Sequence, residues 1–306
     1  MSYDPFLPGP LSVSSRTVTA HDASRDRDFP VEIWRSSHTA DTAPLICFSH
    51  HSYGTRKSSS FLCTHLASHG YTVVALDHSE VVAPVAPAPD ETASQRQQRV
   101  DRIVADRVPD ARFLLDTAGA MFAPTGVGMA GHSFGGWTSI GLADADERID
   151  AVVAITPGGA AKPQPGVLDA PLYPTRSVPT LFLAAEYDVP IPPADVRDLF
   201  TRTPGATLMC TLGNADHFHF VDDVADAHEA MRAEEVTGDA AWMPGAMRPI
   251  DELCAPEPAH AFTRALVLAH FDAYLRADDA AVGFLCNGLP RTLADHGIGA
   301  DVEVRR

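Results

Sequence analysis

The chain has 306 residues, of which 45% are hydrophobic and 21% charged, as expected of a folded globular protein rather than a disordered one. Its formal net charge is −17 and no cluster of lysine and arginine stands out, which disfavours nucleic-acid and anionic-membrane partners. No run approaches the roughly 18 apolar residues of a membrane span. Because the N-terminus also lacks the basic and apolar regions of a secretion signal, we expect a cytoplasmic protein without membrane association.

The cysteines show no C-x-x-C pairing and are odd in number, which predicts reduced and mostly packed thiols. A bond between Cys254 and Cys286 is the one pairing left open. The full set is Cys47, Cys63, Cys210, Cys254 and Cys286.

The first third of the chain alternates between strand and helix patterns. Residues 16–20 and 30–34 alternate apolar and polar side chains, which predicts two antiparallel edge strands. The apolar runs at 43–48 and 71–76 predict strands that are covered on both faces. Between them, residues 59–68 predict a helix that ends at a glycine.

The middle of the chain begins with a proline-containing stretch, 81–90, which predicts a loop. Residues 92–120 follow with a helical pattern, and Pro109 is expected to begin a second helix over 110–117. A glycine-rich strand-turn-helix stretch comes next, at 126–143.

Three more buried strands are predicted at 151–155, 178–185 and 206–212. Strands that alternate with helices in this way predict an α/β fold with a mainly parallel, doubly wound sheet in a single domain, residues 1–306. Residues 221–257 are acidic, rich in alanine and broken by Gly and Pro, so we expect a small helical excursion that lines or covers the pocket as a partial lid. An amphipathic helix is expected at 259–275, and the last thirty residues are expected to be loop and tail.

The stretch Gly131-His132-Ser133-Phe134-Gly135 has the form G-x-S-x-G, in which a serine sits on a sharp turn between a strand and a helix. The glycines lack the Cβ atoms that would collide where strand and helix pass closely. The helix N-terminus offers free N–H groups to an oxyanion. We therefore expect Ser133 to be a nucleophile.

A serine nucleophile needs a histidine base and a carboxylate that orients the base, and both are expected after later strands. Asp188 follows the strand at 178–185 and is the expected acid, with Glu186 as the alternative. His217 and His219 lie in the loop after the strand at 206–212, and His217 is the preferred base.

An oxyanion hole in such a site uses the backbone N–H of the residue after the nucleophile and a second N–H from the loop after an earlier strand. Phe134 supplies the first, and Ser52, or else Tyr53, is placed to supply the second. The residues expected to line the substrate pocket are Tyr53, His51, His132 and Trp242.

These motifs resemble the α/β-hydrolase superfamily. Within it the chain is most similar to bacterial proteins related to platelet-activating-factor acetylhydrolase and to predicted dienelactone hydrolases, and more distantly to cutinase-type polyester hydrolases. The likeness rests on residues 3–6, 48–50, 66–71, 110–116, 131–136 and 217–220. It implies an α/β-hydrolase fold with Ser133 as nucleophile, Asp188 as acid and His217 as base.

Two departures from the family pattern bear on function. The oxyanion loop reads Ser49-His50-His51 where the family commonly has Ser-His-Gly, so the backbone of the second donor can differ. Dienelactone hydrolases use a cysteine nucleophile, whereas this chain has Ser133, so an ester is the expected substrate.

The leading hypothesis is a serine hydrolase that cleaves small to medium carboxylic esters, or polyesters, through an acyl-enzyme without a cofactor. A non-catalytic ligand-binding protein of the same fold is the alternative. A metallohydrolase is a third hypothesis, but its histidines fit no standard zinc spacing. Those histidines are His50, His51, His78, His217 and His219.

Overall fold

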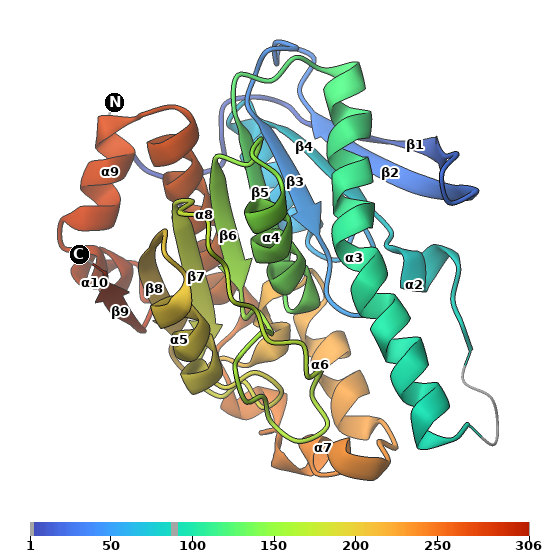
Figure 1. The fold of residues 1–306 in the computed structure, drawn as a ribbon. Helices are drawn as coiled ribbons and strands as arrows, with labels where there is room; N and C mark the ends of the chain where they lie inside the picture. Colours follow the sequence, from blue (N-terminus) through green and yellow to red (C-terminus); the bar gives the residue numbers. More distant parts are fainter. Residues whose placement is uncertain (1–2, 87–90, 306) are drawn as a thin grey trace.

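A computed structural model describes residues 3–86 and 91–305, and these build a nine-stranded sheet in the order β1-β2-β4-β3-β5-β6-β7-β8-β9 (Figure 1). The sheet is parallel from β4 through β8, while β1, β2 and β9 run antiparallel to their neighbours. The mainly parallel sheet expected from the sequence is therefore confirmed. The strands are β1 (Ser14–Asp22), β2 (Arg27–Arg35), β3 (Leu45–Ser49), β4 (Thr72–Leu76), β5 (Val127–His132), β6 (Ala151–Ile155), β7 (Thr180–Ala185), β8 (Ala206–Leu212) and β9 (Ala300–Val304).

Helices cover both faces of the sheet, which is the doubly wound arrangement (Figure 1). Helices α3 (Ala93–Met121), α4 (Phe134–Ala145) and α5 (Pro193–Arg202) pack on one face. Helices α1 (Ser60–Ser68) and α8 (Pro256–Leu275) pack on the other. Strands β3 to β7 are buried along their whole length because both of their faces are covered, as their continuous apolar sequences require.

The register of the parallel strands brings their carboxyl ends to one edge of the sheet. Ser49 at the end of β3 pairs with Gly131 in β5, and His132 pairs with Ile155 at the end of β6. Ala185 at the end of β7 pairs with Leu212 at the end of β8. The loops that follow these strands therefore meet at this edge, where ligands of open α/β sheets bind.

The stretch 221–257 lies at the same edge and is made of short helical pieces (Figure 1). It follows η1 (His217–Phe220), a single turn of 3-10 helix that carries both His217 and His219. Its pieces are α6 (Val224–Ala233), η2 (Gly238–Ala240), α7 (Met243–Ala246) and η3 (Ile250–Glu252).

Helix α3 is continuous through Pro109, so the expected break into two helices is wrong. A proline inside a helix removes one hydrogen bond and costs about 3 kcal/mol. Tertiary contacts on the C-terminal side hold the helix together. Asp110 accepts hydrogen bonds from the Ser79 N–H and from Arg25, while Ala111 and Leu114 pack in the core.

Two further differences concern loops. The short helix α2 (Ser79–Val82) includes the first two residues of the loop expected at 81–90, and residues 87–90 lie outside the described part. The last thirty residues were expected to be loop and tail, but they form α9 (Asp279–Cys286), α10 (Leu289–Asp295) and the edge strand β9. Strand β9 is held by antiparallel pairing with β8 rather than by an apolar run of its own, because most of it is half-exposed or exposed.

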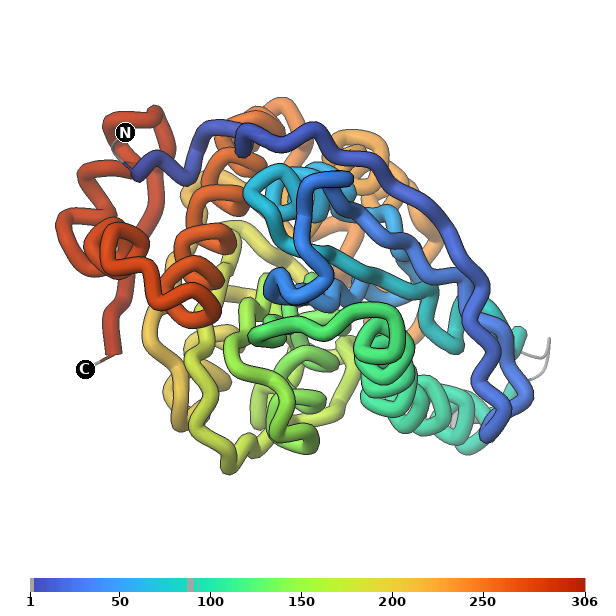
Figure 2. The backbone as a smooth tube through the Cα atoms, turned by 90° about the horizontal axis from the view of Figure 1, so that it is seen from above, coloured from blue at the N-terminus to red at the C-terminus, as the bar shows by residue number. Residues whose placement is uncertain are grey.

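The N-terminal segment runs along the outside of the molecule to the C-terminal helices (Figure 2). The ring of Phe6 stacks on His296 with centroids 3.8 Å apart, and also contacts Phe284.

Cys254 and Cys286 are both free thiols, so the pairing that the sequence left open is not formed. No helix within residues 3–86 and 91–305 is long and apolar enough to cross a bilayer.

Candidate active site

Ser133 lies at the corner between β5 and α4 with a backbone φ of 58° and ψ of −118°. Such a positive φ costs a non-glycine residue about 1–3 kcal/mol, and the surrounding packing must hold it. The Ser133 N–H donates to the Ile155 carbonyl at 2.8 Å. A Cβ at Gly131 would lie 2.2 Å from the Gly135 carbonyl oxygen, and one at Gly135 would lie 1.9 Å from the Ser49 oxygen. Glycine at 131 and 135 is therefore required for the corner.

Asp188 and His217 form a buried pair at the carboxyl edge, although 29 positions separate them in the sequence. His217 Nδ1 donates to Asp188 Oδ2 at 2.8 Å, and the Ile191 N–H donates to Asp188 Oδ1 at 2.7 Å. The two loops are joined directly, because the Tyr187 N–H donates to the Ala215 carbonyl at 2.8 Å. With Nδ1 committed to the carboxylate, Nε2 of His217 is the nitrogen that can accept a proton.

Burial and charge act in opposite directions on this pair. Burial alone disfavours the charged imidazole, but attraction to the Asp188 carboxylate and the hydrogen bond to it outweigh burial and raise the pKa of His217 above its usual value. Burial raises the pKa of Asp188 in spite of the nearby histidine. The arrangement thus stabilises a protonated His217, which is what a base needs after it has taken a proton.

The alternative acid and base have other partners. Glu186 accepts a hydrogen bond from the Asn214 N–H at 2.8 Å. His219 binds Asp216 at 3.0 Å through Nδ1 and donates to the Cys254 carbonyl at 3.0 Å through Nε2. The structure thus brings together Asp188 and His217, and it directs Glu186 and His219 to contacts within the loops.

His132 ties the base loop to the strand that carries Ser133. Its Nε2 donates to the His217 carbonyl at 2.9 Å, and the two rings lie 4.8 Å apart between centroids. His132 was expected to line the pocket, but its side chain is completely buried, so its contact is with the base loop and not with solvent. Within the described residues, no hydrogen bond joins the Ser133 hydroxyl to His217, and such contacts often tighten only when a substrate is bound.

The loop after β3 faces the first turn of α4, where the oxyanion donors were expected. Neither the Ser52 nor the Phe134 N–H has a backbone or side-chain acceptor in the part of the chain that the structure describes. Tyr53, the alternative donor, has a φ of 54° and is 62% exposed. The half-buried His51 ring lies 5.5 Å from that of His132, and burial lowers the pKa of His51 to about 4, so it is neutral at pH 7.

Sequence reasoning missed two polar residues at this site. Thr156, directly after β6, places its hydroxyl 3.3 Å from His217 Nδ1. Arg107, in α3, is completely buried and donates to the His50 and His51 carbonyls. The sequence does indicate that Arg107 is unusual, because it places an arginine on the apolar face of a predicted helix.

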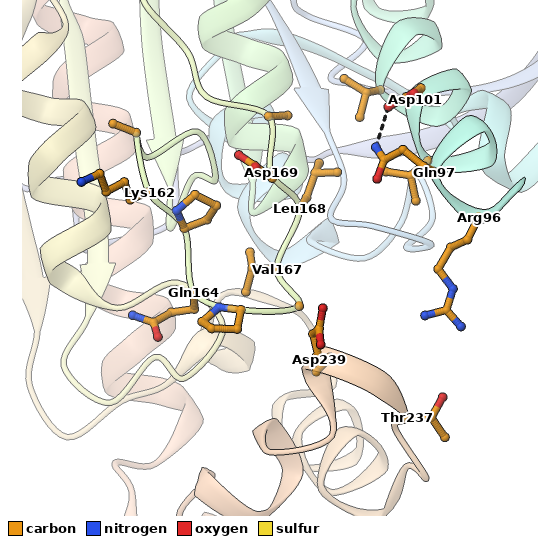
Figure 3. A pocket seen from close by; sticks show the side chains of 18 of the residues that line it. Arg96, Gln97, Asp101, Lys162, Gln164, Val167, Leu168, Asp169, Thr237 and Asp239 are labelled. Carbon is orange, nitrogen blue, oxygen red and sulfur yellow. Dashed lines mark hydrogen bonds between the residues drawn. The ribbon is translucent and has the colours of Figure 1, made fainter. Parts of the chain in front are cut away.

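A cleft of about 1140 Å³ lies between α3, the loop at 161–170 and residues 237–240 (Figure 3). Its wall has both apolar and polar side chains. The apolar ones are Val100, Val104, Val167 and Leu168, and the polar ones include Gln97, Asp101, Lys162, Asp169 and Asp239. Trp242, an expected pocket residue, is 38% exposed and donates through Nε1 to the Pro165 carbonyl at the rim of this cleft.

The histidines of the metal hypothesis are engaged in other contacts. His50 accepts the His78 N–H, and His78 Nε2 lies 2.7 Å from the Ser49 hydroxyl. Across residues 3–86 and 91–305, no three or more His, Cys, Asp and Glu side chains are grouped to hold a metal ion.

Comparison with known proteins finds one matching family model and several similar esterases. Residues 21–117 match the family described as platelet-activating factor acetylhydrolase, isoform II. A cutinase of Thermobifida alba, est1, is 27% identical over 168 residues, which cover 54% of this chain and 50% of that protein. A cutinase of Thermobifida fusca is 25% identical over 217 residues, 71% of this chain and 64% of that one. The chain thus spans about half the length of the first curated relatives it matches.

Among solved structures, a ferulic acid esterase from Streptomyces cinnamoneus superposes with a TM-score of 0.62 over 89% of this chain and 93% of that one, at 23% identity. This likeness concerns the fold. The sheet order, the strained serine corner and this superposition together show the α/β-hydrolase fold. Its sequence is similar to platelet-activating-factor acetylhydrolases and to cutinases.

Proposed function

We propose that the protein is a serine esterase that hydrolyses carboxylic esters through an acyl-enzyme. The observation that carries the proposal is the buried Asp188–His217 hydrogen bond of 2.8 Å beside a serine held at a strained strand-to-helix corner. Cutinases and an acetylhydrolase among its relatives support the reaction class.

In this mechanism His217 Nε2 takes the proton of the Ser133 hydroxyl while the Ser133 oxygen attacks the ester carbonyl. Asp188 keeps His217 in the tautomer that leaves Nε2 free, and it stabilises the imidazolium that forms. The Phe134 and Ser52 N–H groups hold the oxyanion of the tetrahedral intermediate, which collapses to an acyl-enzyme as His217 returns the proton to the leaving alcohol. Water then repeats the sequence to release the acid.

The cleft supports an ester with a bulky acid or alcohol part. Ser133, Asp188 and His217 do not line this cleft, but its walls belong to elements that adjoin the site. Trp137, one turn after Ser133, donates to the Ala170 carbonyl at 2.7 Å, and Val104 lies in α3 three residues before Arg107. A volume of about 1140 Å³ exceeds the need of a short acyl group. We propose that the segment 221–257 acts as a partial lid over one end of this cleft, since Gly166 approaches Ala240 closely and Trp242 binds Pro165.

The test is turnover of p-nitrophenyl acetate by the wild type, by Ser133→Ala and by a matched control, Ser37→Ala. Ser37 is an exposed serine far from the corner, so its loss should leave the rate unchanged. Loss of the nucleophile should lower kcat by about 10⁴-fold or more. Comparable rates in the wild type and Ser133→Ala would remove Ser133 from the mechanism, and absence of turnover in all three would favour the non-catalytic ligand-binding alternative.

Substrate size is tested by a series of p-nitrophenyl esters of increasing acyl length, followed by a polyester film. We expect kcat/KM to hold or rise from acetate to medium acyl chains, because the mixed wall of the cleft offers apolar contacts beyond the carbonyl. A sharp fall beyond acetate would contradict the assignment of this cleft to the substrate. Cytoplasmic location and a likeness to dienelactone hydrolases stay predictions.

A further inference from the structure

A buried guanidinium lies directly behind the loop that follows β3. The side chain of Arg107 is completely buried. Its Nη1 donates to the His50 carbonyl at 2.7 Å, and its Nη2 donates to the His51 carbonyl at 3.2 Å. Two successive carbonyls therefore point toward one positive charge.

The orientation of these carbonyls fixes the N–H groups on the other side of the loop. In a trans peptide the C=O and N–H point in opposite directions, and the His51 carbonyl belongs to the same peptide unit as the Ser52 N–H. When Arg107 binds the His51 carbonyl, the Ser52 N–H is directed away from α3. The His51 oxygen also accepts from Gly54 N at 3.0 Å and from His50 Nδ1 at 2.6 Å, so the peptide plane is held from several sides.

The same guanidinium contacts the second oxyanion element. The Cζ atom of Arg107 lies 4.3 Å from the centroid of the Phe134 ring, in a cation–π contact. Phe134 is the residue after the nucleophile and begins α4. Arg107 thus contacts the peptide unit that carries the Ser52 N–H, and it also contacts the ring of Phe134. These are the two residues whose N–H groups are proposed to hold the oxyanion.

A buried charge of this kind needs a partner, and α2 provides it. Glu80 accepts a hydrogen bond from Arg107 Nη2 and is itself buried. Helix α2 is in turn fixed to α3, because the Ser79 N–H and hydroxyl both donate to Asp110 at 2.7 Å. An unpaired buried charge is strongly destabilising, so the arginine stays in place only with this carboxylate.

Charge distinguishes Arg107 from the other donors to the loop. Hydrogen bonds from a charged donor are roughly twice as strong as those between neutral groups. Burial lowers the pKa of His50 well below its usual value, so its ring is a neutral donor. Removal of Arg107 would leave only neutral groups to hold the peptide between His51 and Ser52.

We propose that Arg107, fixed by Glu80, is the positioning residue that orients the Ser52 N–H of the oxyanion hole through the His51 carbonyl and holds Phe134 against the same loop. This inference rests on the proposed esterase function. It assigns to Arg107 no contact with the substrate.

The experiment compares Arg107→Lys with a matched control, Arg176→Lys. Arg176 also donates to several backbone carbonyls, but at the opposite end of α4, with bonds of 2.5 Å to Ala143 and 2.7 Å to Asp146. Lysine keeps the charge but loses the planar fork that reaches two carbonyls at once. Thermal unfolding identifies the variants that are folded.

Two quantities are measured with each folded variant: kcat and KM for p-nitrophenyl acetate, and the inhibition constant of an alkyl trifluoromethyl ketone. This ketone forms a tetrahedral adduct with a serine nucleophile, and the adduct oxygen occupies the oxyanion hole. For Arg107→Lys we expect kcat to fall about 10- to 100-fold, with KM within about twofold, since loss of a whole oxyanion donor costs about 10²–10³-fold. The inhibition constant should rise by the same factor. For Arg176→Lys both values should stay at the wild-type level.

A folded Arg107→Lys with wild-type kcat and wild-type inhibition would overturn the inference, as would a fall in kcat without weaker inhibition. If Arg107→Lys does not fold, Glu80→Gln provides the same comparison, because it removes the negative charge that holds the guanidinium in place, and the same outcomes decide. If the wild type itself does not hydrolyse the ester, the proposed function fails and this inference fails with it. Activity in the wild type together with an unaffected Arg107 variant removes only the inference.

Discussion

Replacement of Gly135 by alanine tests how tightly α4 packs against the loop after β3, the two elements proposed to hold the oxyanion. A Cβ at this position would lie 1.9 Å from the Ser49 carbonyl oxygen and 2.8 Å from that of His50. Ordinary contact begins at 3.4 Å, so α4 and the loop after β3 must separate by about 1.5 Å. Both neighbours are backbone atoms, so no flexible side chain can absorb the shift.

The expected result is a loss of both activity and stability. Misplacement of catalytic groups by about 1 Å can cost about 100-fold in rate, and overpacking costs about 1–3 kcal/mol. We expect kcat for p-nitrophenyl acetate to fall about 100-fold, and the free energy of unfolding in urea to fall by about 1–3 kcal/mol. The matched control is Gly119→Ala in α3, where an added Cβ meets no atom within 4 Å. A Gly135→Ala protein with wild-type kcat would refute the close packing described here.

Three further predictions follow from the geometry. Gly119→Ala, besides its use as a control, should raise the free energy of unfolding by about 0.5–1 kcal/mol, because alanine is the better helix former, and a lower stability in urea would contradict this. Asp188→Asn should lower kcat about 10⁴-fold. Because His217 must be neutral to act, kcat/KM of the wild type should rise with pH through the raised pKa of His217. In the variant this rise should move to lower pH. An unchanged pH profile would argue against the pair. Asp216 holds the pKa of His219 at about 10 against the effect of burial, so this pair stabilises the fold fully below pH about 6.5 and loses its effect as the pH rises toward 10. The melting temperature of the wild type should therefore fall between pH 7 and pH 10 more than that of Asp216→Asn, and equal slopes would rule out this role.

The central sheet could be predicted because its strands are buried on both faces and therefore apolar throughout. The runs that became β3, β6, β7 and β8 are of this kind. Strand β9 carries no such signal, because it is an exposed edge and its position is fixed by pairing with β8.

Local sequence also identified the serine corner, because the glycines at 131 and 135 are required by contacts within a few residues of the turn or with the adjacent strand. The pairing of Asp188 with His217 could be anticipated only from the position of each residue after a strand. Asp188 contacts His217 whereas Glu186 binds the Asn214 N–H, and the hydrogen bond between Tyr187 and Ala215 joins the two loops, which are distant in sequence.

The contacts of Arg107 could not be predicted from the local sequence, because they too join segments that are distant in the chain. Its contacts reach the loop after β3, α2 and α4, and none of these partners is within a helical turn of it in the sequence. A helix pattern indicates that position 107 is buried, but only the assembled fold shows which carbonyls lie opposite.

The most direct test of the account is the mass of the intact protein, followed by peptide mapping, after reaction with a fluorophosphonate. Attack by a serine hydroxyl that His217 has activated should add a single phosphonyl group to the wild type, on the peptide that contains Ser133, and none to Ser133→Ala. A wild-type protein that stays unlabelled, or that carries the group on another residue, would contradict the assignment of Ser133 as the nucleophile.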